Sequence, residues 1–270
     1  MSSHHNSLRW RSGVNLVVIA AALVAITVIT NAYSFNLMLR NFRQSLSSTA
    51  QIYTEQISGK VDKINSGSLE LVSLAASSQN YYTSSPLGRY LTQQDILTRL
   101  QDRIRYVESS DLYFFYRTDS DELLTALSNR PSTGSSYFWN QYLMLPPTQP
   151  ANTWFSVTCN GETWLMCYYN VSQVRVGAAV RAKTLLQSLY ADTGLVQDSG
   201  FALAGLDGTI VYSSQPDLMA CGTSLAGHIP ASLIVESHTV PEVGTLLLFR
   251  PSSDLLHQLS GSFGWLLLLN

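Results

Sequence analysis

The sequence is poor in charged residues, and lysine is the scarcest of them. Asp, Glu, Lys and Arg make up 13% of the 270 residues, about half of the roughly 25% that is usual in soluble globular proteins. The lysines are Lys60, Lys63 and Lys183, and the formal net charge is −2. Nucleic-acid binding depends on clustered cations that contact phosphates, so we exclude nucleic acid as a partner. With 10% aromatic residues, the chain is not a highly charged disordered one either.

Cysteine is also scarce, and catalytic motifs are missing. The three cysteines, Cys159, Cys167 and Cys221, are too few for a small fold held together by disulfides. The sequence has no GxxxxGK[ST] or GxGxxG loop, no HExxH, no CxxC and no GxSxG. Asp119 and Asp121 lack the glycine and glutamate of a calcium loop, and the histidines lack metal-ligand spacing. We therefore expect no metal site, no cofactor and no enzyme activity in this chain.

One long uncharged stretch does occur, from Gly13 to Tyr33. About 20 apolar residues in a helix cross the hydrocarbon core of a bilayer. Trp10 and Tyr33 stand at the two ends of the stretch, where amphipathic aromatic residues are enriched. We expect residues 13–33 to form a retained transmembrane helix. The alternative is a signal peptide cleaved after Thr30-Asn31-Ala32, which has the small-x-small pattern of a cleavage site.

Basic residues flank this stretch on both sides. They are Arg9 and Arg11 before it and Arg40 and Arg43 after it. The pair before the stretch lies closer to it, and the segment that carries this pair is short. We therefore expect a protein of the cell membrane in which residues 1–12 are a cytoplasmic stub and residues 34–260 are extracytoplasmic.

The chain ends in a second apolar segment, Phe263–Leu269. This segment is too short to cross a bilayer. No Lys or Arg follows Pro251, as expected for a flank on the outer side of a membrane. We expect residues 257–270 to be the start of a truncated second transmembrane helix. An apolar tail that packs on the domain is the alternative.

A helical pattern follows the first apolar stretch. Residues 14–85 contain no proline, and apolar or small side chains recur with a period of about 3.6 residues, the α-helical value. This stripe consists of Phe35, Leu39, Phe42, Leu46, Ala50, Tyr53, Ile57, Val61, Ile64, Ser68, Leu71 and Ala75. We expect one long helix continuous with the membrane span. We expect a second helix over Thr92–Arg105 with Thr92 as its cap.

The pattern then changes to strands. Asp111–Arg117 is rich in aromatic residues, and Leu123–Leu127 is expected to pair with it. In Trp154–Tyr169, Asn160-Gly161 predicts a two-residue hairpin turn. Paired residue numbers then sum to 321, so Val157 faces Trp164. Because side chains alternate along a strand, Cys159 and Cys167 fall on opposite faces and a disulfide between them is not expected.

The two faces of this hairpin differ. The better core face carries Phe155, Val157, Trp164, Met166 and Tyr168. The other face is more mixed, as the lining of a ligand cavity often is. Its members are Trp154, Ser156, Thr158, Thr163, Leu165, Cys167 and Tyr169.

A second strand-rich block follows a third strand at 174–180 and a linking helix at 183–190. Asp207-Gly208 predicts another two-residue hairpin between 201–206 and 209–214. Strands at 233–240 and 244–249 complete a small antiparallel sheet. We therefore expect an α+β fold in which a long N-terminal helix carries two PAS-like antiparallel-sheet modules. Gly161 and Gly208 should have positive φ and belong to separate sheets.

This order of parts resembles the double-Cache sensor domain. The segment Phe201–Tyr212 (FALAGLDGTIVY) is similar to the membrane-proximal hairpin of that family, and Thr245–Leu256 (TLLLFRPSSDLL) to its closing strand and exit helix. The resemblance implies a membrane-distal module within residues 34–192 and a membrane-proximal module at 193–256. It also implies an extracytoplasmic ligand sensor, which we expect to form a homodimer through the long helix.

Double-Cache domains occur on bacterial sensor histidine kinases, chemoreceptors and cyclic-dinucleotide enzymes. In layout the chain is most similar to sensor kinases of Gram-positive bacteria. We therefore expect the sensing and transmembrane-signalling portion of a two-component sensor histidine kinase. The kinase region, through which a response regulator would be a partner, is absent from the chain. The alternatives are a membrane-anchored extracellular binding or adhesion protein without a signalling module, and a secreted enzyme after signal cleavage.

The resemblance also directs attention to a ligand site. The amino-acid-binding subgroup carries an Arg-x-x-Trp-Tyr motif, but alignment on Trp139 places Ser136 at the arginine and Asn140 at the tyrosine. The carboxylate clamp is therefore missing, which argues against an α-amino acid bound in the usual way. No carboxylate or cation pair is evident among the candidate residues, so we expect a neutral small-molecule ligand or none. Aromatic side chains with a polar edge would stack on such a ligand and hydrogen-bond to it. The candidate site residues are Tyr116, Trp139, Tyr142, Trp154, Cys167 and Tyr169. The alternative is that these aromatic residues belong to the core.

Overall fold

The computed structural model describes most of the chain. The described residues are 3–78, 85–107, 110–120, 122–128, 151–159, 161–191, 199–226 and 229–253. Residues 47–252 form one compact unit, and residues 1–46 belong to a second one. Trp139, Tyr142 and the expected second membrane segment lie outside the described residues.

One helix, α1 (Ser3–Ser78), contains both the apolar stretch and the predicted stripe. From Val14 onward it includes an 18-residue window with a mean hydropathy of 2.3, none of it buried, so by length and composition it can cross a membrane. Every member of the stripe from Leu46 to Ala75 is buried. The 3.6-residue period therefore predicted correctly which side of the helix packs against the rest of the compact unit.

Helix α2 (Pro86–Tyr106) begins earlier than predicted. The hydroxyl of Ser85 caps it by accepting from the Gly88 N–H at 3.3 Å, and Pro86 follows in the first turn. Proline fits that position because its missing N–H would have no helical partner there. Thr92, the predicted cap, lies inside the helix and donates its hydroxyl to the Gly88 carbonyl.

Sheet A is built from five antiparallel strands in the order β2-β1-β5-β4-β3. The strands are β1 (Leu112–Arg117), β2 (Glu122–Leu127), β3 (Phe155–Cys159), β4 (Glu162–Val171) and β5 (Val174–Arg181). The β3–β4 register is the predicted one, since Val157 pairs with Trp164 and Cys159 with Glu162. Gly161 has the expected positive φ, +79°.

Sheet B is a separate four-stranded sheet in the order β7-β6-β9-β8. Its strands are β6 (Gly200–Gly205), β7 (Ile210–Ser213), β8 (Leu233–Val240) and β9 (Gly244–Pro251). The two hairpins thus lie in different sheets, as predicted. The linking segment forms two short helices, α4 (Ala182–Leu185) and α5 (Gln187–Ala191), in place of the single predicted helix.

The β6–β7 connection is longer than the predicted two-residue turn. The register shifts at a bulge between Leu203 and Ala204, and Gly208 has φ +76°. The Asp207 carboxylate accepts from both the backbone N–H and the hydroxyl of Thr209. Aspartate side chains readily accept from the backbone N–H two residues further along the chain. These two bonds therefore stabilise the longer loop between β6 and β7.

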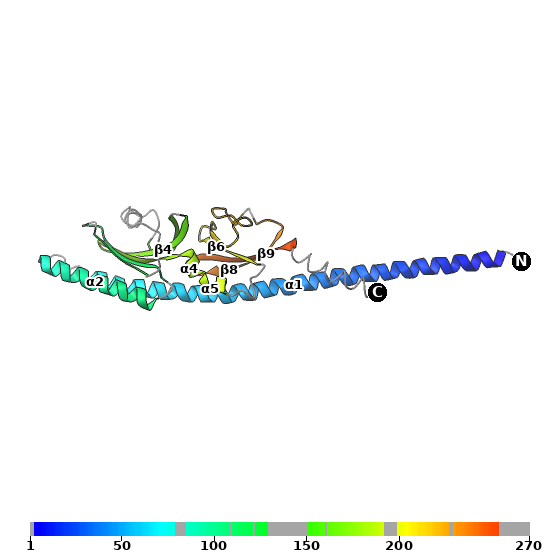
Figure 1. Cartoon of the computed structure of the whole chain (residues 1–270), viewed down its shortest axis with the longest axis horizontal. Coiled ribbons are helices and arrows are strands. Elements are labelled where there is room, and N and C mark those ends of the chain that lie inside the picture. Colours follow the sequence, from blue (N-terminus) through cyan, green and yellow to red (C-terminus); the bar gives the residue numbers. More distant parts are fainter. Residues whose placement is uncertain are drawn as a thin grey trace. The chain divides into compact units, whose positions relative to one another are not determined.

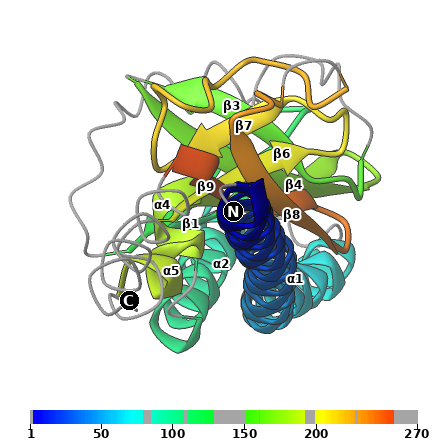
Figure 2. The ribbon, with the colours of Figure 1, turned by 90° about the vertical axis from the view of Figure 1, so that its right-hand side faces the viewer.

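Within residues 47–252, both sheets lie on the same side of α1 (Figures 1 and 2). Sheet A meets the helix through Tyr113, whose hydroxyl donates to the Ile64 carbonyl at 3.3 Å. Gly67 permits this approach, because a Cβ there would lie 2.5 Å from the Tyr113 hydroxyl. Sheet B meets the helix through His238, whose Nε2 lies 3.1 Å from the Ser47 hydroxyl. The long helix therefore contacts both sheets.

Candidate functional site

The two faces of sheet A have different surroundings. Tyr113 and Cys167 share the face that packs on α1, because their partners on β5 in the registers are both Ala178. Tyr116 pairs with Arg175 on β5. Side chains alternate along a strand, and Arg175 and Ala178 are separated by an odd number of positions, so Tyr116 lies on the opposite, outer face of the sheet. This corrects the expectation that Tyr116 shares a cavity with Trp154, Cys167 and Tyr169.

Of the other predicted residues, Trp154, Cys167 and Tyr169 lie on the side of sheet A that faces the helix. Trp154 is buried, and its indole N–H donates to the side-chain oxygen of Asn65 on α1 at 3.2 Å. Burial raises the pKa of the Cys167 thiol to about 12, and the nearby Glu242 carboxylate adds to the shift. Burial likewise raises the pKa of Tyr169 to about 12. A thiol with so high a pKa is not a nucleophile at neutral pH. Because Trp154 and Cys167 are buried on this face, we assign the face to packing on α1.

The outer face of sheet A carries a buried cation. Arg175 is only 8% exposed. Its guanidinium carbon lies 5.7 Å from the ring centre of Tyr116 and 5.2 Å from that of Tyr168. Its Nε donates to the Asn170 side-chain oxygen at 3.4 Å. Cation–π contacts of this kind strengthen when they are removed from water, and burial lowers the pKa of Arg175.

Apolar side chains extend this face away from Arg175. The buried cluster consists of Leu112, Phe114, Trp164, Met166, Tyr168 and Ala179. Gly177 lies between β1 and β4, where an added Cβ would come within 2.2 Å of the Cys167 carbonyl oxygen and 2.9 Å of the Phe114 ring. The outer face therefore combines a cation and tyrosine hydroxyls with a large apolar surface, the composition of many small-molecule sites.

A second arginine stabilises the far end of this face. Arg181 donates its guanidinium to one Asp111 carboxylate oxygen at 2.8 Å and its backbone N–H to the other at 2.8 Å. Its guanidinium carbon lies 5.5 Å from the Trp164 ring. The bond to Asp111 raises the pKa of Arg181. Because Asp111 accepts both bonds, we assign this pair to holding the end of β5 against the start of β1.

Arg175 was missed in the sequence because a single charged residue in a strand is usually exposed to solvent. A signal was nevertheless present. Arg175 interrupts the otherwise apolar run Val174–Val180, and its side chain points to the same face as the glycine at 177. β5 is the central strand of sheet A, and Arg175 is buried there.

The outer face of sheet B, by contrast, is apolar among the described residues. It carries Ala202, Ala204, Ile210, Leu233, Leu247 and Phe249, with Met219 packed into the same cluster. Leu225, from the loop that follows β7, also packs against it. The small alanine side chains on the strand leave room that the chain's own Met219 fills. This face therefore has the character of a closed core.

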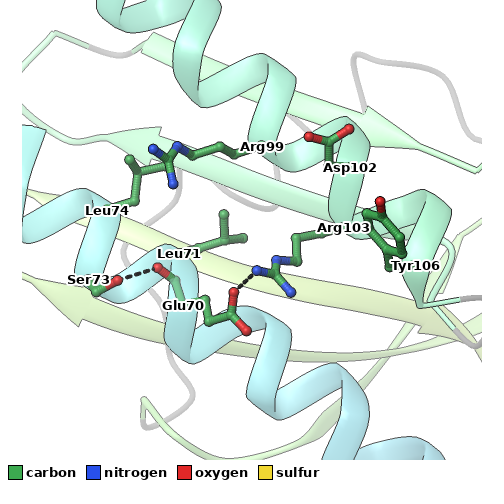
Figure 3. Close-up of a pocket in the computed structure, with 8 residues that line it drawn as sticks. All are labelled: Glu70, Leu71, Ser73, Leu74, Arg99, Asp102, Arg103 and Tyr106. Carbon is green, nitrogen blue, oxygen red and sulfur yellow. Dashed lines mark hydrogen bonds and ion pairs between the residues drawn. The ribbon is translucent and has the colours of Figure 1, made fainter.

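A hollow of about 350 Å³ lies elsewhere, between α1 and α2. Its floor includes Leu71 and Leu74, and Figure 3 shows Arg103 reaching across it to Glu70. These two residues form an ion pair, but an exposed pair of this kind contributes at most about 1 kcal/mol. The hollow contains none of the predicted site residues. In the part of the chain that the structure describes, no cluster of His, Cys, Asp and Glu could hold a metal ion.

No protein-family model matches this sequence, and no curated protein sequence matches it. Solved structures match its fold. The periplasmic sensory domain of the Campylobacter jejuni chemoreceptor Tlp1 is 9% identical, with a TM-score of 0.54, over 80% of this chain and 97% of that one. The ligand-binding domain of the Pseudomonas aeruginosa amino acid chemoreceptor PctB, in complex with L-Arg, is 13% identical, with a TM-score of 0.50, over 82% and 92%. At these identities the likeness shows the fold: the chain has the α+β fold of periplasmic sensory domains.

Proposed function

We propose that the chain is the extracytoplasmic sensing and transmembrane-signalling portion of a bacterial receptor. The observation that carries this proposal is the continuity of α1. The same helix is long and apolar enough to cross a membrane and, further along, buries its stripe under both sheets. A helix shared in this way can carry a displacement of the sheets toward the membrane. The shared fold with periplasmic sensory domains supports the same function.

The finer assignments are part of the proposal. We retain a two-component sensor histidine kinase as the proposed full-length protein, with residues 1–12 cytoplasmic and residues 34–260 outside. We also retain a homodimer formed through the long helix. Two exposed apolar residues on α1, Ile52 and Leu69, lie away from the buried stripe and support such a contact.

We place the ligand on the outer face of sheet A, next to Arg175. This retains Tyr116 from the predicted site and replaces the helix-facing residues with Tyr168 and Arg175. The neutral ligand was expected because no cation was evident among the predicted residues. A buried guanidinium is a strong partner for a carboxylate or another planar anion, so we propose a small ligand with an anionic group. The outer face of sheet B has no cation among its described residues, which makes sheet A the preferred location.

A ligand panel with an arginine variant tests this site. The full chain in lipid nanodiscs is screened by thermal shift against acetate, L-lactate, succinate and L-glutamate, with glucose and glycerol as neutral compounds. We expect an anion to raise the Tm, since binding to the folded state alone stabilises it. Arg175→Met should abolish that shift. Arg99→Met, which changes an arginine whose side chain is 59% exposed, should keep it. A shift caused by neutral compounds alone, or an anion shift that survives Arg175→Met, would contradict the site.

A further inference from the structure

We propose that the side chains of Trp154, Asn65 and Glu242, here called the Asn65 junction, couple sheet A to sheet B through α1. Trp154 directly precedes β3 of sheet A, Asn65 lies on α1, and Glu242 lies in the turn between β8 and β9 of sheet B. A displacement of sheet A at Trp154 is then transmitted to the β8–β9 turn. The coupling requires no ligand, so it can fail or hold independently of the proposed sensory function.

Asn65 uses both ends of its amide. Its oxygen accepts from the Trp154 indole N–H at 3.2 Å, and its nitrogen donates to the Glu242 carboxylate at 2.6 Å. An indole N–H can only donate and an ionised carboxylate can only accept. The bridging group must therefore be an acceptor on one side and a donor on the other. An amide satisfies this requirement, whereas an aliphatic side chain satisfies neither half and a carboxylate only the half toward Trp154.

The backbone of Glu242 points to a role for its side chain. Glu242 has φ +65°, in the left-handed region that glycine, asparagine and aspartate tolerate better than glutamate does. The turn itself is closed by the Val243 N–H, which donates to the Val240 carbonyl, and so does not depend on the glutamate side chain. Residues held in a strained backbone conformation are often functional. The bond from Asn65 on α1 to the Glu242 carboxylate is a role that a glycine at this position would not fill.

Glu242 also lies close to sheet A itself. Its carboxylate contributes to the raised pKa of both Cys167 and Tyr169 on β4. The β8–β9 turn therefore lies near sheet A at β4 as well as next to α1, and Asn65 joins it to the residue before β3. Coupling at this point needs no long pathway, because three elements meet at one amide.

Hydrogen exchange of the full chain in nanodiscs tests the coupling. Trp154→Phe keeps the buried ring and removes the N–H donor. We expect amide exchange to rise about fivefold, the effect of losing one hydrogen bond, both around 151–158 and in the β8–β9 turn at 239–245. Ser66→Ala is the matched control, because the Ser66 hydroxyl donates within its own helix, to the Asp62 carbonyl. It should change neither segment. A rise confined to 151–158 in Trp154→Phe would overturn the proposal.

A reversal of the amide and the carboxylate gives a second, independent measurement. Asn65→Asp can still accept from Trp154 but places a carboxylate against Glu242. Exchange at 239–245 should therefore rise, and the coupling should raise it at 151–158 as well, although the bond to Trp154 is retained. Adding Glu242→Gln supplies an amide donor to the new carboxylate at position 65, and protection at 239–245 should return. A rise confined to 239–245 in Asn65→Asp, or a double variant that exchanges at both segments as fast as Asn65→Asp, would overturn the proposal. This comparison holds even if Trp154→Phe fails to fold.

Discussion

The guanidinium of Arg175 lies over the ring of Tyr116, its directly paired residue on the neighbouring strand. Both side chains are buried on the face of sheet A that points away from the long helix. Removing a charged group from water is costly. Two tyrosine rings and the Asn170 side-chain oxygen contact the guanidinium there. Charged residues are rarely buried to this extent, which makes Arg175 a functional candidate.

The first prediction separates the function of Arg175 from its contribution to stability. Arg175→Met removes the buried charge and retains most of the side-chain volume. The substitution removes the cost of keeping a charge away from water, which offsets the loss of the contacts with the two tyrosine rings and with Asn170. We therefore expect the free energy of unfolding, from urea titration monitored by circular dichroism, to stay the same or rise while the response to anions is lost. Marked destabilisation, with ligand response intact, would make Arg175 a structural residue.

The second prediction concerns the contact between α1 and sheet A. Gly67→Ala places a Cβ 2.5 Å from the Tyr113 hydroxyl, and overpacking of this kind costs about 1–3 kcal/mol. Gly59 lies in the same helix with nothing within 4 Å of an added Cβ. Gly59→Ala should therefore stabilise the protein by about 0.5–1 kcal/mol through helix propensity.

Thermal unfolding of both glycine variants measures this contrast. Tyr113→Phe removes the atom that clashes, so it should restore part of the stability lost in Gly67→Ala. Equal effects of the two alanine substitutions would mean that sheet A does not rest on α1 at Gly67.

The third prediction is a pH dependence above pH 9. The pKa of Cys167 is raised from 9.0 to about 12 in the folded chain. Below pH 9 the thiol is neutral in both states, so the stability is fully present. Above pH 9 the unfolded chain loses this proton first, so the folded state loses stability until the pH reaches the folded pKa. Each group of this kind lowers the free energy of unfolding by at most about 1.4 kcal/mol per pH unit.

Urea titrations between pH 8 and 11 measure that slope. Cys167→Ala should make the decline shallower. Equal slopes in the wild type and Cys167→Ala would show that Cys167 is not held neutral by burial.

Much of the fold could be predicted because the signals were local. The buried stripe of α1 follows from a 3.6-residue period, and the pairing of Val157 with Trp164 follows from the turn at Asn160-Gly161. The early start of α2 was missed because the predicted helix began at Thr92 and left Pro86 outside it. A proline ring is favourable in the first turn of a helix, and the Ser85 cap places Pro86 in that turn.

The candidate site could be predicted only in part. Strand alternation separates Trp154 and Cys167 from Tyr168, but it does not tell which face will meet another element. Both faces of sheet A are rich in aromatic residues, and the face with Trp154 packs on α1, where Asn65 accepts from the indole N–H. The partner lies far away in the sequence, so no local pattern reveals it. Tyr116 was among the predicted site residues, whereas its neighbour Arg175 was not, because their contact depends on the pairing of β1 with β5.

An extracytoplasmic sensor requires residues 47–252 to lie outside the cytoplasm, and the native Cys221 reports on this directly. Cys221 is exposed and Cys167 is buried, so a Cys159→Ser background leaves Cys221 as the reactive thiol. Intact spheroplasts that express the full chain are treated with a membrane-impermeant maleimide, with Cys221→Ser as the control. We predict labelling of Cys221 without permeabilisation and none in the control. Labelling that appears only after the membrane is opened would place the sheets in the cytoplasm and contradict an extracytoplasmic sensor.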